Sequence, residues 1–487
     1  MNNIFKLVIT IIIFLTQISA DEEVKSSLKA NGMPVYFDKP GSADTFKDML
    51  REGKVYGRLR NNNFYHRWGT EDSSHTDHMI NGFGASLVYN SAKYSGFDFG
   101  VGLYASTALF NDSKIPTSHL KPGKDTISRY DYENDGDKYM AVLGQAYIKY
   151  SGIDDTDIIF GRQLVETFYV HSNDTKMIPN TFDGLVIRTK AIPKTDFKVA
   201  YLYNQKLRDH TRTHSVLMYG DGNSTNETRP EWSENDDSGM HKGLTYTALK
   251  AAGKPTDAPL ILVDFKNKSV DNLKIDGSFY MVPELLSQGM LEFNYKFNFD
   301  GFSLSPGFRY INQFDSGAGS VGGASLSGLS KTAGYKDPTS LDSQMIAVRL
   351  VAKIDEYKIN LGYSHILDEA DLVTPWRGFP TAGYTRSMGI YNWFANTKSY
   401  RLEVVRNTNK TAVYRDPFVQ ASVLYIDGDE DKTAGKDELY YYLGVIQNIP
   451  SFPSLQYRLR LGYAQFTDSA DNDFNYLDSR FELNYMF

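Results

Sequence analysis

Basic residues that alternate with apolar ones are the chemically most informative feature of this 487-residue chain. This spacing puts charged and apolar side chains on opposite faces of a β-strand. Arginine and lysine can pair with carboxylates and other anions, and the planar arginine fork does so bidentately. The basic residues with this spacing are Arg58, Arg60, Arg188, Lys190, Lys198, Arg309, Arg349, Lys353, Arg401, Arg458, Arg460 and Arg480.

If the apolar faces contact lipid, these basic side chains must lie on the opposite side, because a Lys or Arg at the bilayer midplane costs about 2–4 kcal/mol. We therefore expect them to line a water-filled interior, where an excess of positive charge would attract anions. The alternative is that they pair with interior acids such as Glu403 and Glu482 and only stiffen the wall. The basic positions that we place inside outnumber the acidic ones, which favours the first interpretation.

The last ten residues of the chain show the strand pattern most clearly. Phe481, Leu483, Tyr485 and Phe487 share one face, and Arg480, Glu482 and Asn484 share the other. Chain ends are normally polar and frayed. An alternating apolar row that runs to the terminus is typical of a strand that closes a membrane β-barrel, since an unpaired strand cannot be tolerated in lipid.

The pattern recurs along the chain from Lys54 onward, in segments 97–103, 302–310, 346–353 and 455–462 among others. Short connections at 94–96, 152–155, 192–195, 298–301, 355–356 and 448–453 alternate with long polar ones at 111–136, 164–182, 208–258, 315–342 and 367–396. Short turns on the periplasmic side and long loops outside are typical of outer-membrane barrels. We predict an all-β, antiparallel transmembrane barrel of about 18 strands, as the strand number must be even when both ends lie on one side.

Two segments precede the predicted barrel, which spans residues 54–487. Residues 1–20 have the short apolar run and small final residue of a cleaved signal peptide. Residues 21–53 are predicted to be a periplasmic segment with one short helix at 42–53, with Ser42 as its N-cap and Gly53 at the left-handed position that follows its C-cap. We interpret this segment as a tether, with a plug or a partner-docking element as the alternative.

The composition excludes several classes of protein. Cysteine is absent, which rules out disulfides and thiolate metal sites. A net charge of −7 argues against a general nucleic-acid binder. The mean hydropathy of −0.42 is compatible with a membrane barrel, because only alternate residues of each strand face lipid.

Motifs for catalysis or metal binding are incomplete. Residues 323–328 begin like a phosphate-binding loop, but Leu329 and Ser330 stand where Lys and Ser or Thr are required. Asp427, Asp429, Asp431 and Glu438 have the spacing of a calcium loop without its turn glycine, so a solvated hairpin is favoured over a divalent-ion or lipopolysaccharide site. His75 and His78 with Asp77 form another weak candidate. We predict no metal site and no cofactor.

A family resemblance adds to this interpretation. Residues 53–60, Gly-Lys-Val-Tyr-Gly-Arg-Leu-Arg, resemble the opening strand of the OprD-type outer-membrane porins. Residues 174–184, Asp-Thr-Lys-Met-Ile-Pro-Asn-Thr-Phe-Asp-Gly, resemble the family segment Asp-Ser-Arg-Leu-Leu-Pro-x-Thr-Phe-x-Gly, and residues 383–388 are also similar. The resemblance implies an eighteen-stranded barrel whose loop after strand five narrows the channel, with Ser172, Asn173, Asp174 and Lys176 as constriction residues. Thr175 and Lys176 depart from the family's Ser-Arg, so the same solute is not implied.

We therefore expect a porin in the bacterial outer membrane that passes small anionic or zwitterionic solutes such as carboxylates, amino acids and short peptides. Its expected partners are outer-membrane lipid, lipopolysaccharide, the solutes and, through the last strand, the barrel-assembly machinery. The expected assembly is a monomer or a loose trimer. An outer-membrane barrel hydrolase and a secreted soluble β-protein are the alternatives.

Overall fold

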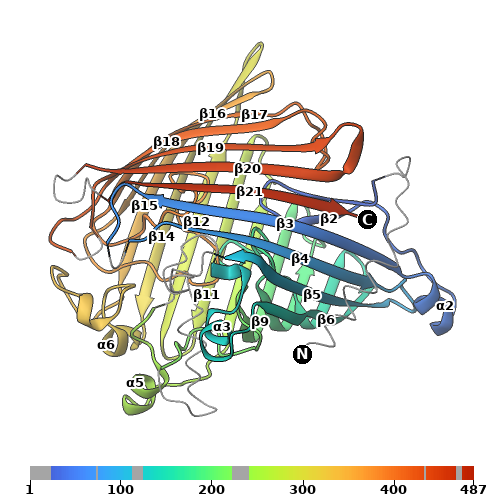
Figure 1. Cartoon of the computed structure of the whole chain (residues 1–487), viewed down its shortest axis with the longest axis horizontal. Helices are drawn as coiled ribbons and strands as arrows, with labels where there is room; N and C mark the ends of the chain where they lie inside the picture. Colours follow the sequence, from blue (N-terminus) through green and yellow to red (C-terminus); the bar gives the residue numbers. More distant parts are fainter. Residues whose placement is uncertain (1–23, 73–74, 112–123, 222–240, 433–434, 468–473) are drawn as a thin grey trace.

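A computed structural model describes residues 24–72, 75–111, 124–221, 241–432, 435–467 and 474–487. The predicted signal peptide lies outside these residues. Strands β3 to β21 form one closed antiparallel barrel (Figure 1). The two-residue strand β13 continues β12, because both pair with β14. The nineteen labelled strands therefore correspond to the eighteen barrel strands that the sequence predicts.

The first half of the barrel consists of nine strands. They are β3 (Lys54–Trp68), β4 (His78–Asn90), β5 (Phe97–Asn111), β6 (Tyr139–Ile153), β7 (Thr156–Gln163), β8 (Thr181–Thr189), β9 (Thr195–Lys206), β10 (Leu260–Asn267) and β11 (Leu273–Val282). Each is hydrogen-bonded to the next in the chain, so the barrel is an uninterrupted meander.

The second half continues in the same way. Its strands are β12 (Leu286–Tyr295), β13 (Phe297–Asn298), β14 (Phe302–Asp315), β15 (Ser343–Ile354), β16 (Tyr357–Ile366), β17 (Lys398–Arg406), β18 (Phe418–Asp427), β19 (Glu438–Ile449), β20 (Phe452–Phe466) and β21 (Tyr476–Met486). Two connections depart from the expected alternation of lengths. Residues 283–285 form a short link at the long-loop end, and residues 407–417 form a long link at the other end.

The barrel closes where β21 pairs with β3. The register runs from Tyr476 opposite Trp68 to Met486 opposite Arg58. Beyond it, the backbone N–H of Phe487 donates to the carbonyl of Gly57 at 3.0 Å, and the Gly57 N–H donates to the Phe487 carbonyl at 2.8 Å. The last residue of the chain is therefore part of the closing ladder.

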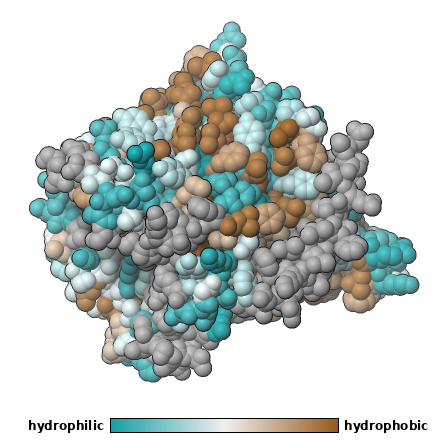
Figure 2. All heavy atoms as spheres, viewed as in Figure 1, coloured by the Kyte–Doolittle hydropathy of each residue, from teal (hydrophilic) through white to brown (hydrophobic). Residues whose placement is uncertain are grey.

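The outer surface of the wall is apolar and the inner surface is polar. Outward residues such as Leu350, Leu361 and Leu402 are exposed, while inward neighbours such as Arg401 and Glu403 are buried. Figure 2 shows apolar side chains gathered over the strands on the face in view. No helix among the described residues has the length and apolar character needed to cross a bilayer.

We call the barrel end that carries Lys54 and Phe487 the terminal end, and the opposite end the loop end. The short helix α2 (Phe46–Arg51) lies at the terminal end, and α5 (Tyr246–Ala251) and α6 (Ala318–Gly322) lie at the loop end (Figure 1). The remaining helices are α3 (Arg129–Asp135), η2 (Lys124–Thr126) and η3 (Leu329–Lys331).

The helix at the terminal end is shorter than predicted and its N-cap differs. Thr45, not Ser42, is the N-cap, and its hydroxyl accepts a hydrogen bond from the Asp48 N–H at 3.1 Å. Ser42 instead forms a β-bridge with Lys93. The C-cap is Glu52, so Gly53 occupies the predicted position after the C-cap, but its φ is not positive. The predicted start was wrong because the bridge holds residue 42 in an extended conformation.

Loops from the loop end fold back and form an apolar core with the inner wall. Residues from 216–218, 244–249, 318–341 and 370–395 pack against β9 to β12, β14 and β15. Two polar anchors fix this core: the Trp376 Nε1–H donates to the Val216 carbonyl at 2.7 Å, and the Tyr280 hydroxyl donates to the Val373 carbonyl at 2.5 Å. A cavity in the interior is lined by residues of β3 and of β17 to β21.

Candidate functional site

The loop between β7 and β8 crosses the barrel interior. Asp174, near its middle, lies 3.0 Å from Arg58 Nη1 and 2.7 Å from Arg60 Nη1, and both arginines are on β3. The Asn62 Nδ2–H donates to the Lys176 carbonyl at 2.7 Å. Since β3 and β7 are separated by three strands of the wall, these bonds span the interior. They hold the loop, here called the crossing loop (residues 164–180), against β3.

The other predicted residues of the crossing loop have different surroundings. The Ser172 hydroxyl donates to Glu166, and Lys176 Nζ lies 2.8 Å from the buried carboxylate of Asp125. Asn173, whose φ is 44°, and Lys176 both line a cavity in the barrel interior. Asp174 and Ser172 hold the loop, whereas Asn173 and Lys176 contribute to the cavity lining.

This interior cavity has a volume of about 550 Å³. Aromatic residues, including Trp68, Tyr391 and Tyr442, form part of its lining. Among the described residues its lining carries one carboxylate, Asp478, and eight basic side chains. The basic ones are Lys176, Arg208, Arg377, Arg386, Arg401, Arg458, Arg460 and Arg480.

Carboxylates partly balance the basic groups of the cavity. Arg401 pairs with Glu403, Arg460 with Glu482 and Arg480 with Asp478. Lys176 and Arg208 share Asp125, at 2.8 and 2.7 Å. Five of the eight cations therefore pair with four carboxylates in the described part of the chain, and the lining itself carries more cations than carboxylates.

Arg386 is held in the cavity wall by aromatic rings. Its guanidinium carbon lies 4.3 Å from the ring centre of Phe379 and 5.7 Å from those of Tyr391 and Trp393. Its Nε and Nη1 atoms are buried and have no hydrogen-bond partner among the described residues. Cation–π contacts orient an arginine without neutralising its charge, so Arg386 remains able to bind an anion.

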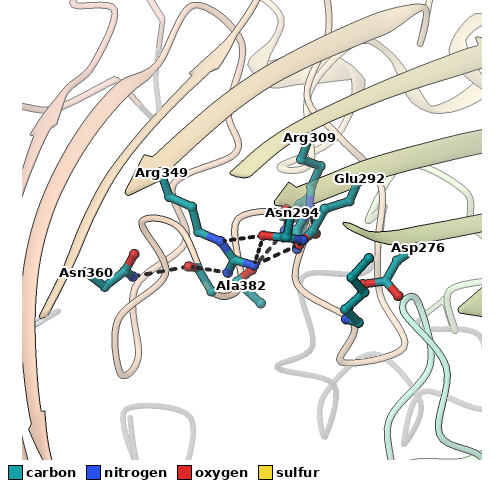
Figure 3. Close-up of polar contacts among 10 residues, drawn as sticks. Asp276, Glu292, Asn294, Arg309, Arg349, Asn360 and Ala382 are labelled. Carbon is teal, nitrogen blue, oxygen red and sulfur yellow. Dashed lines mark hydrogen bonds and ion pairs between the residues drawn. The ribbon is translucent and has the colours of Figure 1, made fainter. Parts of the chain in front are cut away.

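A second loop, residues 380–383, is held by a polar network on the wall opposite β3 (Figure 3). Arg309 Nε donates to Glu292 at 2.8 Å and its Nη1 donates to the carbonyls of Pro380 and Ala382 at 2.7 and 2.8 Å. Arg349 donates to Glu292 at 2.9 Å and to the Gly383 carbonyl at 2.9 Å. Both arginines have their donors occupied by protein groups.

Comparison with solved structures identifies the architecture. Pseudomonas aeruginosa OccK8 (OprE) aligns with a TM-score of 0.66 and 15% identity over 90% of this chain and 99% of that one. A BenF-like porin from Pseudomonas fluorescens Pf-5 gives 0.67 and 13%, over 90% and 99%. Acinetobacter baumannii OccAB1 gives 0.66 and 15%, over 91% and 98%. The chain has the OprD-type porin fold. No protein-family model and no curated protein sequence matches it.

Three of the predicted basic residues lie away from the cavity of this OprD-type barrel, near its terminal end. Arg188 is about half exposed and lies 3.7 Å from Asp157. Lys190 is exposed in the turn after β8, and Lys353 is exposed one residue before the end of β15. The strand pattern indicated that Arg188 and Lys353 face inward, but it could not indicate how far along the barrel axis they lie.

The twelve basic residues that the sequence places inside thus fall into three groups, of which the three residues near the terminal end are the first. Arg401, Arg458, Arg460 and Arg480 line the cavity. Arg58, Arg60, Lys198, Arg309 and Arg349 hold loops. Arg208, Arg377 and Arg386 were missed because they lie in loops, where strand periodicity gives no signal, although Arg386 falls in the family-like segment 383–388.

In the described part of the chain no group of three or more His, Asp or Glu side chains is placed to hold a metal ion. Glu166 accepts a hydrogen bond from the Ser172 hydroxyl and lies 2.7 Å from His171 Nδ1. The acid lies between serine and histidine, so this grouping lacks the serine-to-histidine hydrogen bond of a hydrolase triad.

Proposed function

We propose that this chain is an outer-membrane porin of the OprD type, through which small anionic or zwitterionic solutes diffuse down their gradients. The solute classes that we propose are carboxylates, amino acids and short peptides. The observation that carries the proposal is the cavity with eight basic side chains and one carboxylate in its described lining. A solute carboxylate could pass between neighbouring guanidinium groups without losing all its hydrogen-bond partners.

The channel is narrowed, in this proposal, by the crossing loop. Its ion pairs with Arg58 and Arg60 support a fixed position inside the barrel. The terminal end would face the periplasm and the loop end the outside. One structure with the same fold is that of Pseudomonas aeruginosa OpdK with vanillate, an aromatic carboxylate, which is compatible with the aromatic residues in the cavity lining.

The hydrolase alternative is not favoured by any grouping of side chains that we describe. The Glu166, His171 and Ser172 group lies closest to such a site, and its connectivity does not activate the serine. Interior polar groups around a water-accessible cavity are better explained by permeation.

The test is a planar-bilayer recording of the purified protein in a salt gradient, with the reversal potential as readout. An anion-selective channel whose current is reduced by small carboxylates is expected. A cation-selective channel, or a protein that conducts no ions while remaining folded and heat-modifiable on a gel, would contradict the proposal.

A further inference from the structure

The N-terminal segment before α2 lies inside the barrel. Strands β1 (Ser26–Leu28) and β2 (Pro34–Tyr36) form a two-stranded hairpin, and all three residues of β1 are buried. The Gln456 Nε2–H donates to the Leu28 carbonyl at 3.1 Å, and Gln456 is an inward residue of β20. Since Gln456 lies on the inner face, the hairpin occupies part of the interior.

Further contacts tie the hairpin to the wall near the terminal end. The Ser27 hydroxyl donates to the Ala412 carbonyl at 2.9 Å, and the Ala30 N–H donates to the Tyr414 hydroxyl at 3.0 Å. The ring of Tyr36 stacks on that of Tyr56, an inward residue of β3, with centres 4.0 Å apart. The contacts reach β3, β20 and the link 407–417, so the hairpin is held from more than one side.

The turn of the hairpin touches the crossing loop directly. Gly32 has a φ of +83°, and a Cβ added to it would lie 2.6 Å from the carbonyl oxygen of Asp174. A residue other than glycine is excluded there by both conformation and space. The hairpin and the crossing loop are therefore packed one on the other, with Asp174 joining Gly32 on one side to Arg60 on the other.

The inner face of β20 gives the order of these features along the barrel. Successive inward residues from the terminal end are Gln456, Arg458 and Arg460. Gln456 bonds the hairpin, whereas Arg460 bonds the Thr175 carbonyl of the crossing loop at 3.4 Å and lines the cavity together with Arg458. A solute that moves from the cavity toward the terminal end meets the hairpin next.

We infer that the hairpin, residues 25–37, is a second constriction of the channel, between the cavity and the terminal opening. This inference rests on the proposed function. An isolated two-stranded hairpin is marginally stable in water, so its position depends on the wall contacts described above. The charged residue at its turn, Lys29, is exposed and can contribute to ion selectivity at this point.

The first experiment uses the absence of cysteine from the chain. In a Lys29→Cys variant, a sulfonate-bearing methanethiosulfonate reagent places a negative charge at the hairpin turn. We expect a drop in single-channel current and in anion preference as the reagent reacts. The matched control is Lys47→Cys, an exposed lysine of α2, where the same reagent should change neither quantity. Complete labelling at residue 29 without an effect would overturn the inference.

The second experiment removes the hairpin by deleting residues 25–37. Single-channel conductance is expected to rise, while unchanged conductance of an assembled barrel would contradict the constriction. If the deletion prevents assembly, a disulfide test on the double variant Ser27→Cys with Ala412→Cys replaces it and checks the position of the hairpin. An oxidant-dependent, reductant-reversible mobility shift of the membrane-embedded protein is expected, and its absence would place the hairpin outside the lumen.

The two proposals fail separately. A parent protein that forms no anion-preferring channel would contradict the proposed function. A parent protein that does form one, but whose conductance is unaffected by deletion of the hairpin, would contradict only the second constriction.

Discussion

Asp174 and Arg60 form an ion pair of 2.7 Å between side chains 114 residues apart in the chain, and their side chains are 5% and 3% exposed. Arg58 binds the other carboxylate oxygen of Asp174 at 3.0 Å. One acid in the crossing loop thus joins it to two successive inward positions of β3. This long-range contact places Asp174 against the inner face of β3.

Replacement of Asp174 by Asn is expected to release the crossing loop. It leaves two buried guanidinium groups without their carboxylate, and breaking a buried pair in this way costs about 3–5 kcal/mol. We expect a lower unfolding midpoint in urea and a larger, noisier single-channel current. Asp154→Asn in the exposed turn after β6 is the control. A variant with parent-like current and midpoint would show that the pair does not fix the loop.

Arg386 and Arg458 are expected to determine ion selectivity more strongly than the paired arginines. No carboxylate lies within ion-pair distance of either in the described residues, unlike Arg401, which pairs with Glu403. Changing both to Gln should lower the anion-to-cation permeability ratio. The difference should shrink in 1 M salt, where the Debye length is about 3 Å. Reversal potentials at low and high salt measure this.

The control for this double variant is Lys353→Gln, which removes a positive charge at the terminal end of β15, away from the cavity. Its effect on the permeability ratio should be smaller. If the double variant loses thermal stability but keeps its selectivity, the interior arginines only stiffen the wall.

Asp371 is expected to make the stability of the loop-end core depend on pH. Burial raises its pKa from 3.8 to about 6, against hydrogen bonds from the N–H groups of Ala395 and Leu326. The folded state therefore binds this proton more tightly than the unfolded state, and the associated stability is lost as pH rises through about 6. Thermal unfolding of the parent between about pH 4 and 7, compared with Asp371→Asn, should show a pH slope below about pH 6 that the variant lacks. Equal slopes would mean that Asp371 is ionised throughout.

Removal of Phe487 is expected to impair closure of the barrel. The deletion removes two backbone hydrogen bonds to Gly57, and the Phe487 ring also fills the space beside that glycine. We expect less heat-modifiable protein in the outer membrane, measured by gel mobility with and without boiling. Phe466→Ser, at the loop end of β20, serves as the control for loss of an aromatic residue elsewhere. Undiminished, heat-modifiable protein would argue against a role of the last residue in assembly.

The sequence by itself determined the barrel and the orientation of its side chains. The two-residue period of segments such as 346–353 and 478–487 fixes which residues face inward, because a strand has only two faces. The strand number and the closing role of the last strand followed from the same pattern and from the sorting of short and long connections. These are properties of local spacing, and every strand repeats them.

Only the tertiary structure decided which inward cations line the interior cavity and which hold loops. Arg58 and Arg458 have the same sequence pattern, yet one binds Asp174 of the crossing loop and the other lines the cavity. From the sequence, residues 21–53 are interpreted as a tether. In the structure, Ser27 of the N-terminal hairpin donates a hydrogen bond to Ala412, a residue 385 positions away. Such partners cannot be read from spacing, because loops have no fixed period and their positions follow from contacts between residues that are far apart in the chain.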